Sequence, residues 1–150
     1  MQRLGLLTGG GDAPGLNAVI RAAVKTACTS FSCDLVGIQD GFDGLLPGGQ
    51  HATVLTSEAV RGLVSRGGTI LGAANRGNPF ARRVMRDGQE AIEDTADQVA
   101  VGMRQLALNG LIVVGGDETL RIAQALIDRF DLPIVAVPKT IDNDFRRVFG

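Results

Sequence analysis

The chain has 150 residues, of which 45% are hydrophobic, and its formal net charge at pH 7 is −1. These values suit one soluble domain of ordinary size, and they do not favour a nucleic-acid partner, which would call for a basic surface. No apolar stretch approaches the roughly 20 residues of a membrane span, and the first residues lack the features of a signal peptide. We therefore expect a cytoplasmic protein that binds neither membranes nor nucleic acid.

The first third of the chain predicts a strand, a glycine turn, a helix and a second strand. RLGLLT, residues 3–8, is a short apolar run that ends at a glycine cluster. After the cluster, apolar residues at helical spacing form one stripe, namely Val19, Ile20, Ala23, Val24 and Ala27. Residues 34–39 predict the second strand, and the glycines and proline of DGFDGLLPGG predict a loop.

The middle third predicts two helices and a surface excursion. Residues 57–67 begin at a capping serine and end at a glycine, which predicts a short helix. Residues 75–88 are polar and irregular, and we expect them on the surface. Residues 89–108 predict a long amphipathic helix, because Ile92, Ala96 and Val99 stand near helical spacing.

The chain has two cysteines, Cys28 and Cys33, and its only histidine, His51, lies far from them in the sequence. A structural zinc site requires four ligands. We therefore expect two free thiols that are buried or half-buried.

The last third predicts a strand at 111–114, a helix at 119–129 and a strand at 134–137. Continuously apolar strands that alternate with helices indicate a parallel sheet covered on both faces, which is a Rossmann-like, three-layer α/β fold. In such sheets ligands bind beyond the carboxyl ends of the strands. We expect the unusual residues at three strand ends, 9–12, 115–119 and 139–144, to converge on one crevice.

The glycine turn TGGGDAPG matches neither of two familiar phosphate-binding motifs. Pro14 stands where the dinucleotide fingerprint has its third glycine, and Leu16 stands where the P-loop requires lysine. Glycine still lets the backbone approach a phosphate, and a following helix offers free N–H groups. One such turn is often only structural, but two such turns at two strand ends favour a polyphosphate ligand.

Carboxylates accompany the second and third strand ends. Asp117 in GGDET is a candidate Mg²⁺ ligand beside polyphosphate, although an aspartate here could also serve as a helix N-cap. Asp142 and Asp144 are candidates for the base that takes a proton from an attacking hydroxyl. Lys139 and Thr140 could neutralise or hydrogen-bond the phosphoryl group in transfer.

Four motifs together resemble the 6-phosphofructokinase family. They are GGDAPGLN, GGTILG with a following arginine and NPF, GGDET, and PKTIDND, in matching order between Leu4 and Asp144. The resemblance implies phosphoryl transfer from ATP or pyrophosphate to the 1-hydroxyl of fructose 6-phosphate, giving fructose 1,6-bisphosphate. It also implies Mg²⁺ as cofactor and a homo-oligomer, a dimer or a tetramer.

The resemblance also assigns roles to residues, which fall into a donor site and a substrate site. The donor site would comprise Gly11, Arg76, Gly116, Asp117, Glu118 and Thr119, with Mg²⁺ on Asp117. Thr140, Ile141 and Asp142 would bind the substrate. The catalytic set would be Asp142 as base, Asp144 beside it, Thr140 and Lys139.

Two residues bear on the identity of the phosphoryl donor. Members that use ATP usually carry glycine where Glu118 stands, and many carry glycine where Lys139 stands. Members that use pyrophosphate resemble GGDD with PKTIDND. The combination in this chain favours pyrophosphate and leaves ATP open.

The family has a second lobe that binds the sugar phosphate, and residues 1–150 do not contain it. We therefore expect residues 1–150 to be the donor-binding lobe, which would be inactive alone. The alternative is an ATP- or polyphosphate-binding remnant, or a regulatory module, without turnover. The presence of Gly11, Asp117, Thr140 and Asp142 favours the enzyme, because a binding module has no need of a base.

Overall fold

A five-stranded sheet forms the centre of the chain in the computed structural model, which describes residues 1–11, 13–46, 51–73 and 77–139. The strand order is β3-β2-β1-β6-β7, in which β1, β2, β6 and β7 run parallel and β3 pairs antiparallel with β2. The strands are β1 (Arg3–Thr8), β2 (Asp34–Ile38), β3 (Ala52–Leu55), β6 (Gly110–Gly115) and β7 (Ile134–Pro138). The four predicted strands are confirmed, and the antiparallel edge strand β3 was not predicted.

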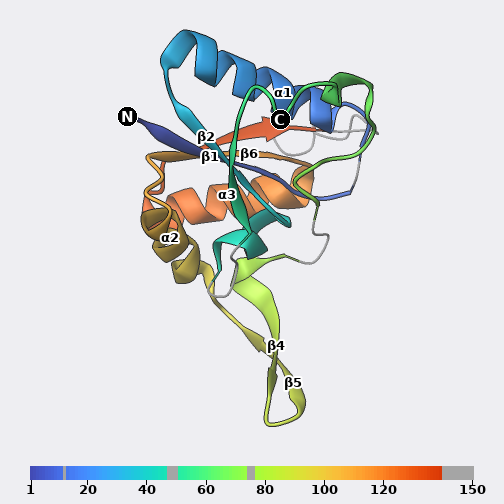
Figure 1. The fold of residues 1–150 in the computed structure, drawn as a ribbon. Coiled ribbons are helices and arrows are strands. Elements are labelled where there is room, and N and C mark those ends of the chain that lie inside the picture. Colours follow the sequence, from blue (N-terminus) through green and yellow to red (C-terminus); the bar gives the residue numbers. More distant parts are fainter. Residues whose placement is uncertain (12, 47–50, 74–76, 140–150) are drawn as a thin grey trace, which may run out of the picture.

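Helices cover both faces of this sheet, so the predicted three-layer α/β fold is confirmed (Figure 1). Helix α1 (Leu16–Thr26) lies on one face, and α2 (Ala96–Gln105) and α3 (Asp117–Phe130) lie on the other. Successive side chains of β1 point to opposite faces, as the pleat requires. Leu6 accordingly joins the apolar cluster under α1, and Leu7 joins the cluster under α2 and α3.

The predicted long helix at 89–108 is wrong in its first part. Residues 82–93 form a hairpin of β4 (Arg82–Arg86) and β5 (Gln89–Glu93), which projects from the body of the molecule (Figure 1). Asp87 and Gly88 connect the strands with φ angles of 50° and 79°. An Asp-Gly pair with both φ angles positive is a favoured two-residue hairpin turn, so this local signal outweighs the helical spacing of Ile92.

The predicted helix at 57–67 is also wrong. The structure has turns there, followed by a single 3₁₀ turn at Leu63–Ser65. Gly62 takes a left-handed φ of 77°, which a helix interior does not accommodate. The loop predicted after β2 contains a short 3₁₀ helix at Gly41–Leu45, and its apolar side chains join the core.

Both cysteines are free thiols, as predicted. Cys33 is buried, whereas Cys28 is exposed, contrary to the expectation that both would be at least half-buried. Cys28 lies in the π-helical turn Ala27–Phe31 that follows α1, in which only Ala27 is buried.

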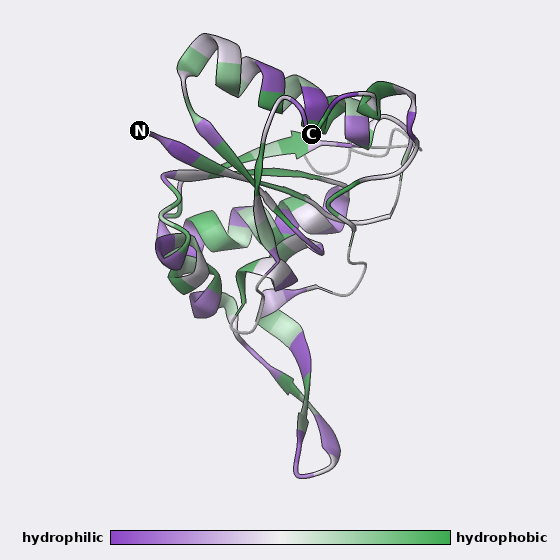
Figure 2. Cartoon of the chain, in the orientation of Figure 1, coloured by the Kyte–Doolittle hydropathy of each residue, from purple (hydrophilic) through white to green (hydrophobic). Residues whose placement is uncertain are grey.

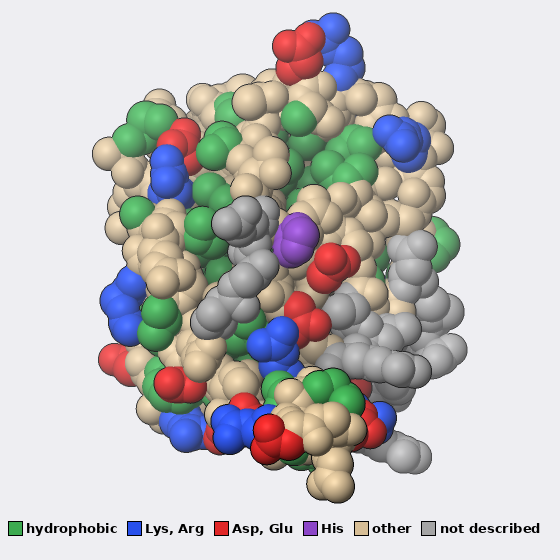
Figure 3. Space-filling view, turned by 60° about the horizontal axis from the view of Figure 1, so that its bottom comes forward, with side chains coloured by type: hydrophobic (Ala, Val, Ile, Leu, Met, Phe, Trp, Pro, Cys, Tyr) green, Lys and Arg blue, Asp and Glu red, His purple; other side chains and the backbone are tan. Residues whose placement is uncertain are grey.

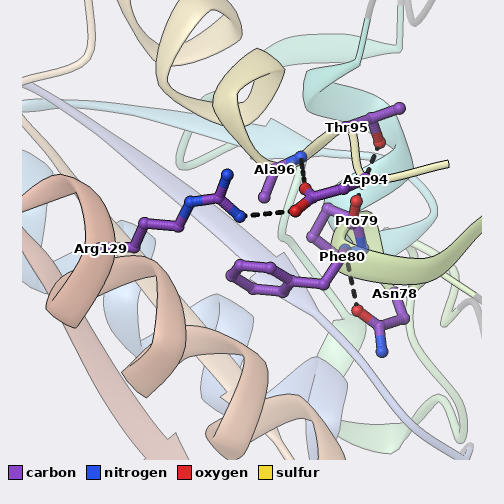
Figure 4. Close-up of polar contacts among 7 residues, drawn as sticks. All are labelled: Asn78, Pro79, Phe80, Asp94, Thr95, Ala96 and Arg129. Atoms are coloured by element: carbon purple, nitrogen blue, oxygen red, sulfur yellow. Dashed lines mark hydrogen bonds and ion pairs between the residues drawn. The ribbon is translucent and has the colours of Figure 1, made fainter.

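An ion pair and three hydrogen bonds attach the base of the hairpin to α3 and α2 (Figure 4). Arg129 of α3 donates to Asp94 at 2.6 Å, and the other carboxylate oxygen of Asp94 accepts from the N–H of Ala96 at 3.0 Å. The backbone and hydroxyl of Thr95 both donate to the carbonyl of Pro79. The Arg129 hydrogen bond, followed by that of Ala96, lowers the pKa of the Asp94 carboxyl.

Aromatic contacts reinforce this attachment. The guanidinium carbon of Arg129 lies 5.8 Å from the ring centroid of Phe80 and 5.0 Å from that of Phe130. Both distances are within the range of a cation–π contact. The segment that contains Pro79 and Phe80 is therefore fixed against the C-terminal half of α3.

Basic and acidic side chains are interspersed on the face of the molecule that carries the hairpin (Figure 3). This mixture agrees with the net charge of −1. None of the helices in the described ranges combines the length and the hydropathy that a membrane crossing needs.

An apolar groove of about 880 Å³ runs between α1 and the β6–β7 end of the sheet. Its lining includes Leu4, Val19, Ala23, Phe31, Ile112 and Val135. Val135 is 64% exposed and Phe31 is 73% exposed. Val135 lies on β7, the edge strand of the sheet, which Figure 2 colours green as hydrophobic.

Candidate functional site

The ends of β1, β6 and β7 meet at one edge of the sheet, as the sequence predicted. The N–H of Gly9 donates to the carbonyl of Val114 at 2.9 Å, and the N–H of Lys139 donates to the carbonyl of Gly115 at 2.8 Å. The ammonium of Lys139 reaches across and donates to the carbonyl of Gly11. The glycine turn after β1 and the residue after β7 are therefore in direct contact.

Two glycines of this turn require the freedom that only glycine has. Gly10 has a φ of 76°, and Gly15, which is the N-cap of α1, has a φ of 96°. Side chains strongly disfavour this region of backbone conformation. The turn places the N-terminus of α1 beyond the end of β1, where the free N–H groups of the first helical turn face outward.

The N-terminus of α3 brings the acidic residues of GGDET to the same edge. Gly116 is the N-cap, and Asp117 and Glu118 lie in the first turn, two residues earlier than the predicted start of the helix. Carboxylates are favourable there because the helix N-terminus carries partial positive charge. Because the N-cap is Gly116 and Asp117 is the first helical residue, the N-cap interpretation of Asp117 is wrong. It pairs instead with Arg121 one turn later, at 3.1 Å.

Thr119 is buried and packs between two glycines. A Cβ at Gly9 would lie 2.6 Å from Cγ2 of Thr119, and a Cβ at Gly115 would lie 2.5 Å from Cβ of Thr119. Both distances are shorter than real side chains allow. Thr119 therefore sets the distance between the glycine turn and α3.

This packing predicts different outcomes when Thr119→Ala is combined with Gly9→Ala and with Gly115→Ala. Gly9→Ala should destabilise the fold by about 2 kcal/mol through overpacking, and Thr119→Ala should restore most of the loss because it removes the atoms that clash. Gly115→Ala should not be rescued in this way, since the Cβ that it meets remains in alanine. Urea unfolding of the single and double variants measures the coupling. Equal rescue of both glycine variants would contradict this role for Thr119.

A small hollow lies under the glycine turn. It holds about 40 Å³ and is lined by residues from four parts of the chain, among them Gly10, Phe42, Asn78 and Glu118. The volume suits about one water molecule and not a substrate. Gly11 does not line this hollow and is exposed.

The structure brings together Gly11, Gly116, Asp117, Glu118, Thr119 and Lys139 of the predicted site residues. Arg76, Thr140, Ile141, Asp142 and Asp144 lie outside the described residues. Their predicted roles remain predictions.

Two residues that the sequence reasoning missed, Thr8 and Asn17, flank the glycine turn and are fully buried. One signal was present for Asn17. It stands three residues before Ile20 and seven before Val24, so a polar amide interrupts the apolar stripe of the helix. Buried amides of this kind almost always have hydrogen-bond partners.

Comparison with known proteins places the chain in a family. The family model described as Phosphofructokinase matches residues 3–148. An ATP-dependent 6-phosphofructokinase of Chloroflexus aggregans is 47% identical over 99% of this chain and 41% of its own length. A pyrophosphate–fructose 6-phosphate 1-phosphotransferase of Streptomyces coelicolor is 44% identical over 95% of this chain and 38% of its own length. The chain thus spans about 40% of the length of these relatives.

Solved structures agree with the sequence comparison. The phosphofructokinase of Pichia pastoris in the T-state superposes with a TM-score of 0.79 at 29% identity, over 95% of this chain and 16% of that one. The phosphofructokinase of Saccharomyces cerevisiae gives a TM-score of 0.72 at 30% identity, over 97% of this chain and 21% of that one. The order of strands, the glycine turn at the sheet edge and the family match lead to one conclusion: the chain belongs to the phosphofructokinase family.

Proposed function

We propose that residues 1–150 form the donor-binding lobe of a 6-phosphofructokinase. The full enzyme would transfer a phosphoryl group from pyrophosphate or ATP to the 1-hydroxyl of fructose 6-phosphate. The observation that supports this most is the meeting of three strand ends, which puts Gly11, the first turn of α3 and Lys139 at one edge of the sheet. Relatives with this activity in their names are 44–47% identical to almost the whole chain.

The proposed donor site holds phosphate by backbone and charge. A Cβ at Gly11 would meet no described atom within 4 Å, so packing against those atoms does not explain the glycine, whereas close approach of a phosphate would. The ammonium of Lys139, now on the Gly11 carbonyl, is near enough to move to a phosphate oxygen. The free N–H groups at the starts of α1 and α3 would add hydrogen bonds.

The residues present fit a Mg²⁺ ion as cofactor. Mg²⁺ commonly takes only one or two protein carboxylates and completes its shell with phosphate oxygens and water. Asp117 offers one carboxylate at the sheet edge, and its partner Arg121 is on the exposed surface. When bound, the ion would neutralise donor oxygens as negative charge shifts toward the leaving group.

Phosphoryl transfer would depend on how these residues position the donor and the substrate. Asp142 would take the proton of the 1-hydroxyl as its oxygen attacks the terminal phosphorus of the donor. The bond from that phosphorus to the bridging oxygen breaks, and phosphate or ADP leaves. Thr140 and Ile141 would hold the substrate, Asp144 would stand beside the base, and Arg76 would contact the donor.

The second lobe would bind the sugar phosphate. The chain spans 41% of the Chloroflexus relative, and we assign the sugar-phosphate site to the remaining length. Residues 1–150 would then show no turnover alone, and the complete protein would be a cytoplasmic homo-oligomer. The alternative, a polyphosphate-binding module without turnover, rests on the same short coverage.

The function is tested in a protein that joins residues 1–150 to the remaining part of the Chloroflexus aggregans relative. We expect Mg²⁺-dependent formation of fructose 1,6-bisphosphate, with pyrophosphate the better donor. Binding of donor with no product from either donor would favour the module without turnover. Failure to bind either donor would contradict the proposed site.

Glu118 is the residue that we expect to select between ATP and pyrophosphate as donor. Its exposed side chain stands in the first turn of α3 and lines the hollow with Gly10, where it adds bulk and negative charge. Glu118→Gly should raise kcat/KM for ATP relative to pyrophosphate by about tenfold, which corresponds to about 1.4 kcal/mol. Both constants are measured in the joined protein, with Asp128→Gly at the far end of α3 as the control. A ratio that does not move would exclude Glu118 as the residue that selects the donor.

A further inference from the structure

Two buried side chains on either side of the glycine turn bind one and the same distant segment. Thr8 is the last residue of β1, and Asn17 lies in the first turn of α1, so they flank the turn at residues 9–15. Both side chains make hydrogen bonds to residues 66–72, which are about 50 to 60 positions away in the sequence. Neither residue has a role in the site as proposed above.

Asn17 is 2% exposed and uses both ends of its amide. Its nitrogen donates to the carbonyls of Arg66 at 3.0 Å and Gly67 at 3.1 Å. Its oxygen accepts from the N–H of Ile70 at 2.8 Å. Three bonds from one amide fix the backbone of 66–70 in a single arrangement against α1.

Thr8 is 0% exposed and continues the attachment at the end of this segment. Its hydroxyl donates to the carbonyl of Gly72 at 2.7 Å and lies 2.9 Å from the hydroxyl of Thr69. Because a hydroxyl has one proton, Thr69 must donate to Thr8, and Thr69 in turn accepts from the N–H of Leu71 at 3.2 Å. These bonds form a chain in which each hydroxyl both donates and accepts, an arrangement that strengthens its members.

The two attached residues stand at the ends of the glycine turn. Thr8 immediately precedes Gly9, and Asn17 lies two residues after Gly15, the N-cap of α1. Bonds from 66–72 to these two side chains therefore hold both ends of the turn that carries Gly11 of the proposed donor site. Holding the turn in place before a ligand arrives lowers the ordering cost of binding.

We propose that Asn17 and Thr8 are positioning residues that fix residues 66–72 against the glycine turn and thereby set the affinity for the phosphoryl donor. The effect on donor affinity rests on the function proposed above. The attachment itself can be measured without any ligand. Failure of the two ideas can thus be told apart.

The first measurement is amide hydrogen exchange of residues 1–150 and of two variants with apolar replacements, Asn17→Leu and Thr8→Val. We expect at least tenfold faster exchange at Ile70 and Leu71 in Asn17→Leu, and at Leu71 and Gly72 in Thr8→Val. The amides of β6 should keep their protection. Thr8→Ser, which retains the hydroxyl, should restore slow exchange.

The second measurement is calorimetric titration of the same proteins with Mg²⁺-pyrophosphate and with Mg²⁺-ATP. Both Asn17→Leu and Thr8→Val should weaken binding by about tenfold or more, and Thr8→Ser should bind as the unmodified chain does. Asn109→Ala is the matched control. Asn109 accepts one backbone hydrogen bond, from Arg3 at the opposite end of β1, so its loss should leave donor affinity unchanged.

The outcomes separate clearly. Unchanged exchange at 66–72 in both Asn17→Leu and Thr8→Val would overturn the attachment. Faster exchange with undiminished donor affinity would overturn its link to binding. No binding by the unmodified chain would count against the proposed function, and the exchange data would still decide whether Asn17 and Thr8 hold the segment.

Discussion

Asp142→Asn is expected to reduce turnover by about 10²–10⁴ in the protein that joins residues 1–150 to the remaining part of the Chloroflexus relative. Asparagine keeps the shape of the side chain but cannot accept the proton of the attacking hydroxyl. Donor affinity should stay within about twofold, since the base would contact the sugar hydroxyl and not the donor. Steady-state kinetics and donor titration of the same samples measure both effects.

Asp128→Asn is the control for this prediction. Asp128 is exposed near the C-terminal end of α3 and accepts a hydrogen bond from Gln124, far from the first turn of the helix. Its replacement removes one carboxylate without touching the donor edge, so turnover should not change. If the Asp142 variant kept more than about a tenth of the turnover number, Asp142 would not be the base.

Of the glycine variants, Gly102→Ala is expected to lower the free energy of unfolding the most. A Cβ at Gly102 of α2 would lie 1.9 Å from the carbonyl oxygen of Leu45, which is backbone and cannot rotate away. Alanine is favoured over glycine in a helix by about 1 kcal/mol, but the overlap outweighs this gain. We expect a net loss of about 3 kcal/mol, at the upper end for overpacked cores.

Guanidinium unfolding of the Gly102 variant is compared with that of Gly67→Ala. Gly67 is exposed, and a Cβ there would meet no described atom within 4 Å, so its replacement should change the free energy of unfolding by less than about 0.5 kcal/mol. Equal stability of the two variants would mean that α2 and the 3₁₀ helix at Gly41–Leu45 are packed less closely than described.

The sequence by itself determined the alternating core of the fold and the edge where the candidate site lies. The strands at 3–8, 34–38, 110–115 and 134–138 are apolar runs bounded by glycine or polar residues, and such runs indicate buried parallel strands. Since parallel strands have their carboxyl ends on one edge, the glycine turn, GGDET and Lys139 could be expected to meet before any coordinates were known.

The middle of the chain could not be predicted in this way. The two apolar residues of 89–93, Ala91 and Ile92, are adjacent and follow neither a helical nor a strand spacing, and it is the turn at Asp87 and Gly88 and the pairing with residues 82–86 that select the strand. The start of α2 at Ala96 depends on Asp94, whose carboxylate accepts the N–H of Ala96 while Arg129 of α3 holds its other oxygen. That arginine lies 35 positions away, so no local pattern contains the signal.

Only the tertiary structure decided what holds the glycine turn in place. The partners of Thr8 and Asn17 lie 49 to 64 positions along the chain, in residues 66–72, which begin at the end of the predicted helix 57–67 that does not form. Periodicity reports which face of an element is buried, but it does not report what a buried polar group bonds to. A buried amide or hydroxyl is satisfied by whichever segment the packing of the layers brings to it, and that is a property of the folded chain alone.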